Sequence, residues 1–156
     1  MRKKISFIDL GKHPITNNFL TISNPKNEFF YNLKLIFHCD TKLVSLAKFV
    51  SPKKMFNEKY AHRASASKTM QVAYSKLADL IKKEYKPKSI LEIGSNDGVF
   101  IKHFKGINNL GVEPCKNLAR ITKKMGIKTY DDFWTYKLSK KIIKEHKRFD
   151  IIYSAN

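Results

Sequence analysis

The chain has 156 residues, which is enough for one ordinary domain or for a small domain joined to part of a larger one. Lysine and arginine total 31 against 13 aspartates and glutamates, so the formal charge is +18 at pH 7. No apolar run reaches the length of a membrane span, and the basic N-terminus lacks the apolar core of a signal peptide, which predicts a cytoplasmic protein without a membrane partner. The charge has two interpretations: lysines on solvated helix faces, or a surface that attracts nucleic acid or another polyanion.

Cysteine usage is sparse. Cys39 and Cys115 lie far apart, and neither belongs to a C-x-x-C pair. Two cysteines make neither a disulfide framework nor a four-cysteine zinc site, so we expect two separate, reduced thiols.

The first 60 residues predict short strands with irregular connections. Strands are expected at 5–8, 29–37 and 43–46, the last two as a hairpin, while residues 9–14 and Asn24-Pro25 are typical of turns and loops. Pro52 begins a short helix. This segment holds few large apolar residues, so we expect it to pack on the rest of the chain.

The remainder alternates helix and strand. Ser67 or Thr69 caps a helix to about residue 85, whose buried face is predicted to hold Ala73, Leu77, Leu80, Ile81 and Glu84. Strands are expected at 89–93, 110–113, 127–130 and 149–153, with helical segments from 98, at 117–124 and around 138–143. This alternation predicts an α/β fold with about four parallel strands in the order 3-2-1-4. The fourth strand would then form an open edge, which is typical of an incomplete catalytic domain.

The most informative stretch reads S-I-L-E-I-G-S-N-D-G, from Ser89 to Gly98. A buried strand followed by a glycine turn is how an open α/β sheet builds a ligand crevice. Glu113 ends the next predicted strand about twenty residues after the glycine, the spacing at which an acid accepts hydrogen bonds from a ribose diol. The alternatives are helix capping for Asn96 and Asp97, and a solvent-exposed strand end for Glu113.

Several segments together resemble the S-adenosylmethionine-dependent sugar C-methyltransferases that carry an N-terminal zinc-binding domain. The similarity runs through D-L-G-K-H-P-I-T-N-N-F-L at 9–20, the serines at 65 and 67, E-I-G-S-N-D-G at 92–98 and G-V-E-P-C-K-N-L-A at 111–119. It implies a partial Rossmann-like class I methyltransferase sheet at 67–156, entered through a linking helix, after a small irregular β-containing domain at 1–66.

The resemblance also implies site residues. The methionine part of S-adenosylmethionine would lie against Glu92, Gly94, Ser95, Asn96, Asp97 and Gly98. Glu113 would hold the ribose hydroxyls, Phe133 and Asp132 would lie near the adenine, and Ala155 and Asn156 would begin the loop under the sulfonium. Tyr60 matches a substrate-contacting tyrosine, while His62 is either a further substrate contact or an ordinary surface histidine.

The metal ligands of that family are largely missing. Its zinc domain uses two pairs of cysteines, whereas this chain begins after the first pair and has His38 and Thr41 at the second. A site made by His38, Cys39 and His13 is the one alternative, and we expect no bound zinc.

The implied reaction is C-methylation of a nucleotide-linked sugar, through an enolate formed next to its 4-keto group. The catalytic histidine of the family lies beyond the fourth strand, so we expect a fragment, with a second chain as the candidate partner that supplies the rest of the sheet. Two alternatives are an RNA-directed methyltransferase and a non-catalytic module that binds nucleic acid. A dinucleotide dehydrogenase is disfavoured because the turn lacks G-x-G-x-x-G.

Overall fold

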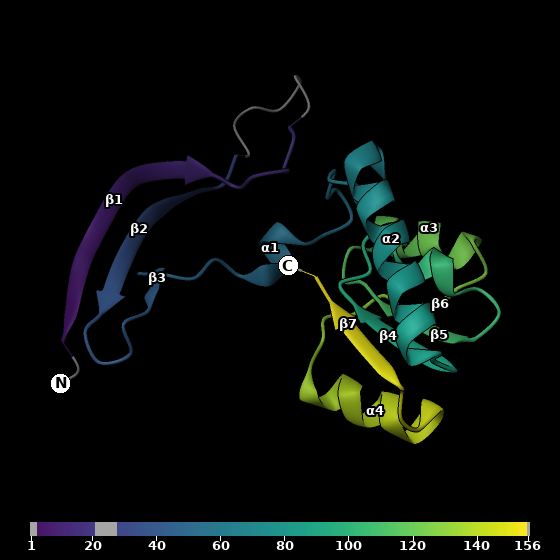
Figure 1. Cartoon of the computed structure of the whole chain (residues 1–156). Helices are drawn as coiled ribbons and strands as arrows, with labels where there is room; N and C mark the ends of the chain where they lie inside the picture. The colour runs from purple at the N-terminus through teal and green to yellow at the C-terminus, as the bar shows by residue number, and fades with distance from the viewer. Residues whose placement is uncertain (1–2, 21–27, 156) are drawn as a thin grey trace. The chain divides into compact units, whose positions relative to one another are not determined.

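The computed structural model describes residues 3–20 and 28–155, and it divides the chain into two compact units, 1–56 and 57–156 (Figure 1). The sequence placed this boundary ten residues later, at 66. The predicted loop at Asn24-Pro25 and the candidate site residue Asn156 lie outside the described residues.

The first unit is a three-stranded antiparallel sheet in the order β1-β2-β3, followed by the short helix α1 (Pro52–Met55). Its strands are β1 (Lys4–Pro14), β2 (Phe30–His38) and β3 (Val44–Leu46). The turn predicted over 9–14 is wrong, because β1 continues through it. Register shifts between Ser6 and Ile8 and between Asp9 and Lys12, together with Gly11 at φ 76°, let the strand accommodate these turn-forming residues as irregularities of the ladder.

The second unit is built on a four-stranded parallel sheet. Its strands are β4 (Ser89–Ile93), β5 (Asn108–Val112), β6 (Lys128–Tyr130) and β7 (Ile151–Ser154). They lie in the order β6-β5-β4-β7, which confirms the predicted order 3-2-1-4 and the Rossmann-like α/β fold. The helices between them are α2 (Lys68–Tyr85), α3 (Lys116–Lys124) and α4 (Tyr136–His146).

Helices cover both faces of this sheet, as a parallel sheet requires. Ile90 packs with Ala78 and Ile81 of α2, whereas its neighbour Leu91 packs on the other face with Leu138 and Ile142 of α4. Adjacent residues of a strand point to opposite faces, so β4 contributes to two separate cores.

Two local predictions for this unit need correction. The inward face of α2 is formed by Tyr74, Leu77, Ala78 and Ile81, while Ala73, Leu80 and Glu84 are exposed. The helix expected after Gly98 is only a 3-10 turn, η3 (Ile101–Phe104), which ends before Gly106 at φ 95°. Its value to the fold is the packing of Phe100 and Phe104, both buried, with ring centroids 5.2 Å apart.

β7 is the last strand on one side of the sheet. Among the described strands β7 pairs only with β4, and its Ile152 is 62% exposed. No helix in the described part of the chain is both long and apolar enough to cross a membrane.

Candidate ligand site at the carboxyl ends of the strands

The bend after β4 contains two glycines whose backbone has positive φ. Gly94 and Gly98 have φ of 75° and 80°, a conformation that side-chain-bearing residues rarely adopt. A Cβ added to Gly98 would lie 3.2 Å from Thr122 of α3, so this glycine allows close packing. A Cβ added to Gly94 would have no atom within 4 Å, so this glycine borders open space. Gly94 is therefore the position where a ligand can approach the backbone.

The backbone amides of the bend are all used within the fold. Gly94 and Ser95 donate to the Val112 carbonyl, at 2.8 and 3.1 Å. The other three donations are Asn96 to Glu113 Oε2 at 2.8 Å, Asp97 to Asn96 Oδ1 at 2.9 Å and Gly98 to Ser95 O at 2.9 Å. A phosphate-binding turn needs free amides, so this bend is not of that type.

Glu113 faces the bend. Its side chain is only 5% exposed, which overturns the alternative of a solvated strand end. Oε2 accepts from the Asn96 amide and Oε1 from the Cys115 amide, each at 2.8 Å. Each carboxylate oxygen has a second lone pair, so Glu113 can accept further hydrogen bonds. The neighbouring Cys115 is no nucleophile, because burial first and then the Glu113 charge raise the pKa of its thiol to about 12.

Glu92 is a buried acid with an unused oxygen. It is 4% exposed, and its Oε2 has no hydrogen-bond partner among the described residues. Burial raises the pKa of Glu92 well above its usual value, and the charges of Glu113 and Asp97 act in the same direction. A cation beside Glu92 would favour its ionised form, so this side chain is suited to hold one.

Asn96 and Asp97 hold a distant part of the chain in place. Asn96 Oδ1 accepts from the Ala64 amide at 2.9 Å, and its Nδ2 donates to the His62 carbonyl at 3.3 Å. The Asp97 carboxylate, 2% exposed, accepts from the Ser65 amide at 3.3 and 3.4 Å and from the Ser65 hydroxyl. The sequence offered ligand contact or helix capping for these residues; in the structure their side chains bind the chain around the short 3-10 turn η2 (Ala64–Ala66).

A third side chain, besides those of Asn96 and Asp97, holds this same segment. Asn117 Nδ2 of α3 donates to the Tyr60 carbonyl at 2.8 Å. Residues 60–65 therefore lie beside the bend, and the Tyr60 and His62 ring centroids are 6.4 Å apart in an edge-on arrangement. Sequence reasoning missed the roles of Ser65 and Asn117, because the groups they contact lie 32 and 57 residues away and leave no local pattern.

Ser95 does not face the open side of the bend. It is 1% exposed, and its Oγ would lie 3.0 Å from a Cβ placed on Gly111. This hydroxyl has no hydrogen-bond partner in the part of the chain that the structure describes. Ser95 thus fills the space above the glycine of β5.

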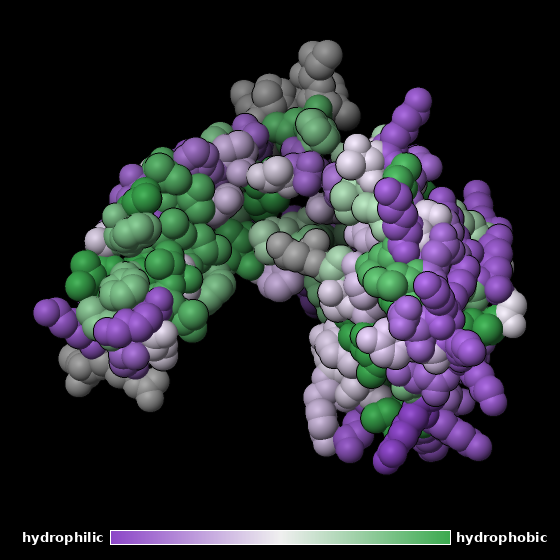
Figure 2. All heavy atoms as spheres, viewed as in Figure 1, coloured by the Kyte–Doolittle hydropathy of each residue, from purple (hydrophilic) through white to green (hydrophobic). Residues whose placement is uncertain are grey.

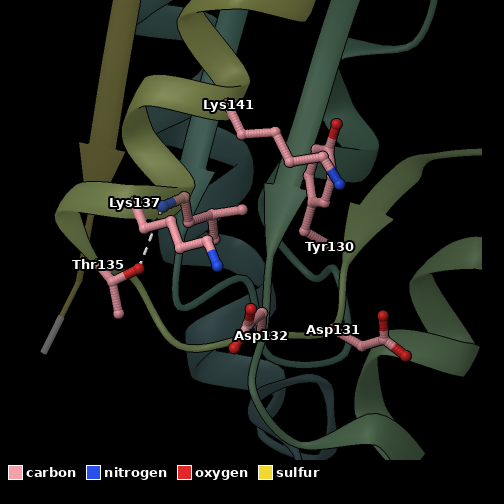
Figure 3. Close-up of a pocket in the computed structure, with 7 residues that line it drawn as sticks. Tyr130, Asp131, Asp132, Thr135, Lys137 and Lys141 are labelled. Atoms are coloured by element: carbon pink, nitrogen blue, oxygen red, sulfur yellow. Dashed lines mark hydrogen bonds between the residues drawn. The ribbon is translucent and has the colours of Figure 1, made fainter.

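A polar cavity of about 400 Å³ lies at the end of β6. Its lining residues come from the end of β6 and from the start of α4 (Figure 3): Tyr130, Asp131, Asp132, Thr135, Lys137, Leu138 and Lys141. Asp132 Oδ1 accepts from the Phe133 amide at 2.8 Å, which leaves its second oxygen for other contacts. Asp132 therefore lines a cavity on the carboxyl-end side of the sheet, and half-buried Phe133 is its neighbour.

The two histidines of the first unit lie far apart. His13 pairs with Tyr31 and His38 pairs with Lys4, so the two histidines are separated by seven positions along β2, roughly 23 Å. Their Nε2 atoms lie within hydrogen-bond distance of Leu10 O and Ser45 Oγ, at 2.9 and 2.8 Å. No group of three possible metal ligands occurs within 3–20 and 28–155. The site considered for His13, His38 and Cys39 is therefore wrong.

Comparisons with known proteins concern the two units separately. Residues 2–56 match the family model Methyltransf_13, described as "Putative zinc binding domain", a range that nearly coincides with the first unit. The crystal structure of the plantazolicin methyltransferase BamL, in complex with a triazolic desmethylPZN analog and SAH, is similar at 19% identity and a TM-score of 0.40. The match covers 57% of this chain and 36% of BamL, so the chain spans about a third of that protein. No curated protein matches the chain.

Proposed function

We propose that residues 57–155 bind S-adenosylmethionine at the carboxyl ends of β4, β5 and β6, as part of a methyltransferase. The observation that carries this proposal is the balance of hydrogen-bonding groups at the bend. Its five amides are bonded within the fold, whereas Glu92 Oε2 has no hydrogen-bond partner among the described residues. The two oxygens of Glu113 each accept from one amide and can accept further hydrogen bonds. A ligand that binds beside Gly94 must therefore bring hydrogen-bond donors and positive charge.

S-Adenosylmethionine has these properties. It carries a sulfonium cation, an ammonium group and two ribose hydroxyls. A dinucleotide cofactor would instead bring a pyrophosphate, which needs free amides and would lie close to the buried carboxylates Glu92 and Glu113. The same balance of donors and acceptors thus disfavours a dehydrogenase.

Each carboxylate binds a different part of the ligand. Glu113, braced by two amides, accepts from the ribose hydroxyls, and Glu92 holds the ammonium group of the methionine part. Asp132, in the cavity at the end of β6, lies on the adenine side, with Phe133 next to it. When bound, the cofactor supplies an electrophilic methyl group. The role of the chain is to orient that group through these contacts.

The proposed methyl acceptor is a carbon of a nucleotide-linked sugar. The support is the position of residues 60–65, which Asn96, Asp97 and Asn117 hold beside the bend. Tyr60 and His62 belong to this segment and match or replace the substrate-contacting residues of the sugar C-methyltransferases that the chain resembles. The base that would form the enolate is not assigned to any residue here, and the uncovered edge of β7 is where a second chain would extend the sheet.

Calorimetry with S-adenosylmethionine tests the site. Gly94→Asn places a side chain in the open space beside the bend, and asparagine tolerates the positive φ of this position. The matched control is Gly126→Asn, at φ 81° and also with nothing within 4 Å. We expect the parent chain and the control to bind, and Gly94→Asn to bind at least tenfold more weakly. Equal affinities in all three proteins would remove the site from the bend, and binding of NAD in preference to S-adenosylmethionine would overturn the donor argument.

RNA is the second candidate methyl acceptor, and the formal charge of +18 supports it. Methyl-labelled S-adenosylmethionine offered with a nucleotide-linked 4-keto deoxysugar or with RNA separates the two. Label in the sugar supports the first candidate, and label in RNA supports the second. Binding of RNA without any affinity for the cofactor would identify a non-catalytic module instead.

A further inference from the structure

Ten of the 21 lysines and arginines of the second unit lie at one edge of its sheet, where the helices end and the strands begin. In a parallel α/β fold each helix ends where the next strand begins, so these segments meet at the amino edge, opposite Gly94. Ten exposed cations lie in them, and we call these the amino-edge cations: Lys82, Lys83, Lys86, Lys88, Lys105, Lys124, Lys128, Lys144, Lys147 and Arg148. Figure 2 shows hydrophilic side chains over most of the visible face of this unit, including the region where Figure 1 places the C-terminal ends of α2 and α4.

Helix ends alone do not account for this number. A cation or two in the last turn complements the dipole of a helix, but three helices end here and ten cations are present. None of the ten forms an ion pair within 4 Å with any residue that the structure describes. Three acids lie near these cations: Asp150 accepts from the Lys88 and Ser89 amides, Glu145 accepts from the Tyr130 hydroxyl, and Glu84 is exposed in the last turn of α2. Ten cations therefore face three acids. So many unpaired like charges destabilise a compact unit unless a partner neutralises them.

The two edges of the sheet differ in charge. The carboxyl edge carries the acids Glu92, Asp97, Glu113, Asp131 and Asp132, together with Lys137 and Lys141 in the cavity at the end of β6. A polyanion is therefore attracted to the amino edge and repelled from the bend. The overall charge, which is spread along the sequence, is polarised by the fold.

We propose that the amino-edge cations bind the phosphate backbone of a single-stranded nucleic acid. Tyr85 favours this partner over a membrane surface, because it is 68% exposed at the end of α2 among Lys82, Lys83 and Lys86. An exposed aromatic ring among lysines is the arrangement on which unpaired bases stack. β4 has five residues, so these contacts lie roughly 17 Å from the bend. The nucleic acid is thus a docking partner at this edge, and its bases there are not the groups offered for methylation.

Fluorescence anisotropy with a labelled single-stranded RNA of mixed sequence, titrated with the full chain at several salt concentrations, tests the proposal. The variant Lys83→Gln/Lys88→Gln/Lys144→Gln/Arg148→Gln removes four amino-edge cations. The control Lys59→Gln/Lys68→Gln/Lys76→Gln/Lys140→Gln removes the same charge from exposed positions elsewhere. We expect the first to bind at least tenfold more weakly at about 100 mM salt and to reduce the slope of log K against log salt by up to about 3. The control should lose less than about threefold.

Tyr85→Ala provides an independent measurement. Stacking is not electrostatic, so this variant should bind RNA roughly fivefold or more weakly and keep the salt slope of the parent. Equal losses of RNA affinity in the two quadruple variants would show that binding depends on the total charge and not on the amino-edge cations, which would overturn the proposal. So would binding to vesicles of phosphatidylserine in the absence of RNA affinity. Circular dichroism of each variant verifies that the fold is retained.

Discussion

Glu113 braces the second unit, so its replacement is expected to destabilise the fold as well as the candidate site. Glu113→Ala removes the acceptor of two amides, those of Asn96 and Cys115, each bonded at 2.8 Å. The Cys115 amide is buried and finds no replacement, which costs roughly 1–3 kcal/mol. Asn96 is partly exposed, so water compensates for part of its loss. We expect a total of about 2–4 kcal/mol, a large share of the roughly 5–15 kcal/mol that stabilises an ordinary domain.

Urea denaturation followed by the fluorescence of Trp134 measures this loss, because Trp134 is the single tryptophan and lies in the second unit. The corresponding fall in Tm for a unit of this size is roughly 10–30 °C. Glu113→Gln should lose less, since it keeps one acceptor but turns an amino group toward the other amide. Glu84→Ala, an exposed acid of α2, is the control and should stay within about 0.5 kcal/mol of the parent. A Glu113→Ala protein as stable as that control would refute the geometry described for the bend.

Three further changes test other contacts. Ser65→Ala removes the hydroxyl that donates to Asp97 and should cost about 1–2 kcal/mol in urea, with faster proteolysis around residues 60–65; unchanged cleavage would contradict the fastening role. Burial raises the pKa of Glu92, so the parent loses stability as pH rises from about 4.5 through the folded pKa, and Glu92→Gln should gain in relative Tm between about pH 5 and 8; a constant difference would speak against it. The amides of Lys88 and Ser89 and the Ser89 hydroxyl help to hold the pKa of Asp150 below 3.8, so its stabilisation is lost as pH falls through the folded pKa. Asp150→Asn should therefore be less stable than the parent at about pH 7, by a difference that shrinks as the pH falls below 3.8, and a series of thermal melts from pH 7 downwards measures it.

The sequence by itself determined the elements of the second unit and their order. Strand and helix periodicity are local signals, and the residues from Ser89 to Gly98 predict both the strand and the bend that follows it. The proximity of Glu113 to the bend was also predictable, because carboxyl ends of neighbouring parallel strands meet at one edge. Local signals gave a wrong prediction in β1, where the residues that were expected to form a turn belong to a long strand. The strand accommodates them through shifts in its register with β2.

Only the tertiary structure decided which polar groups are satisfied and which remain available. Asn96, Asp97 and Asn117 look like ligand or capping residues until the chain brings residues 60–65 against them. The buried face of α2 was likewise selected by docking on the sheet, since the predicted and observed stripes share Leu77 and Ile81. The concentration of ten cations at the amino edge has the same origin. Composition sums charges along a chain, whereas a parallel sheet sorts them according to which end of each element they occupy.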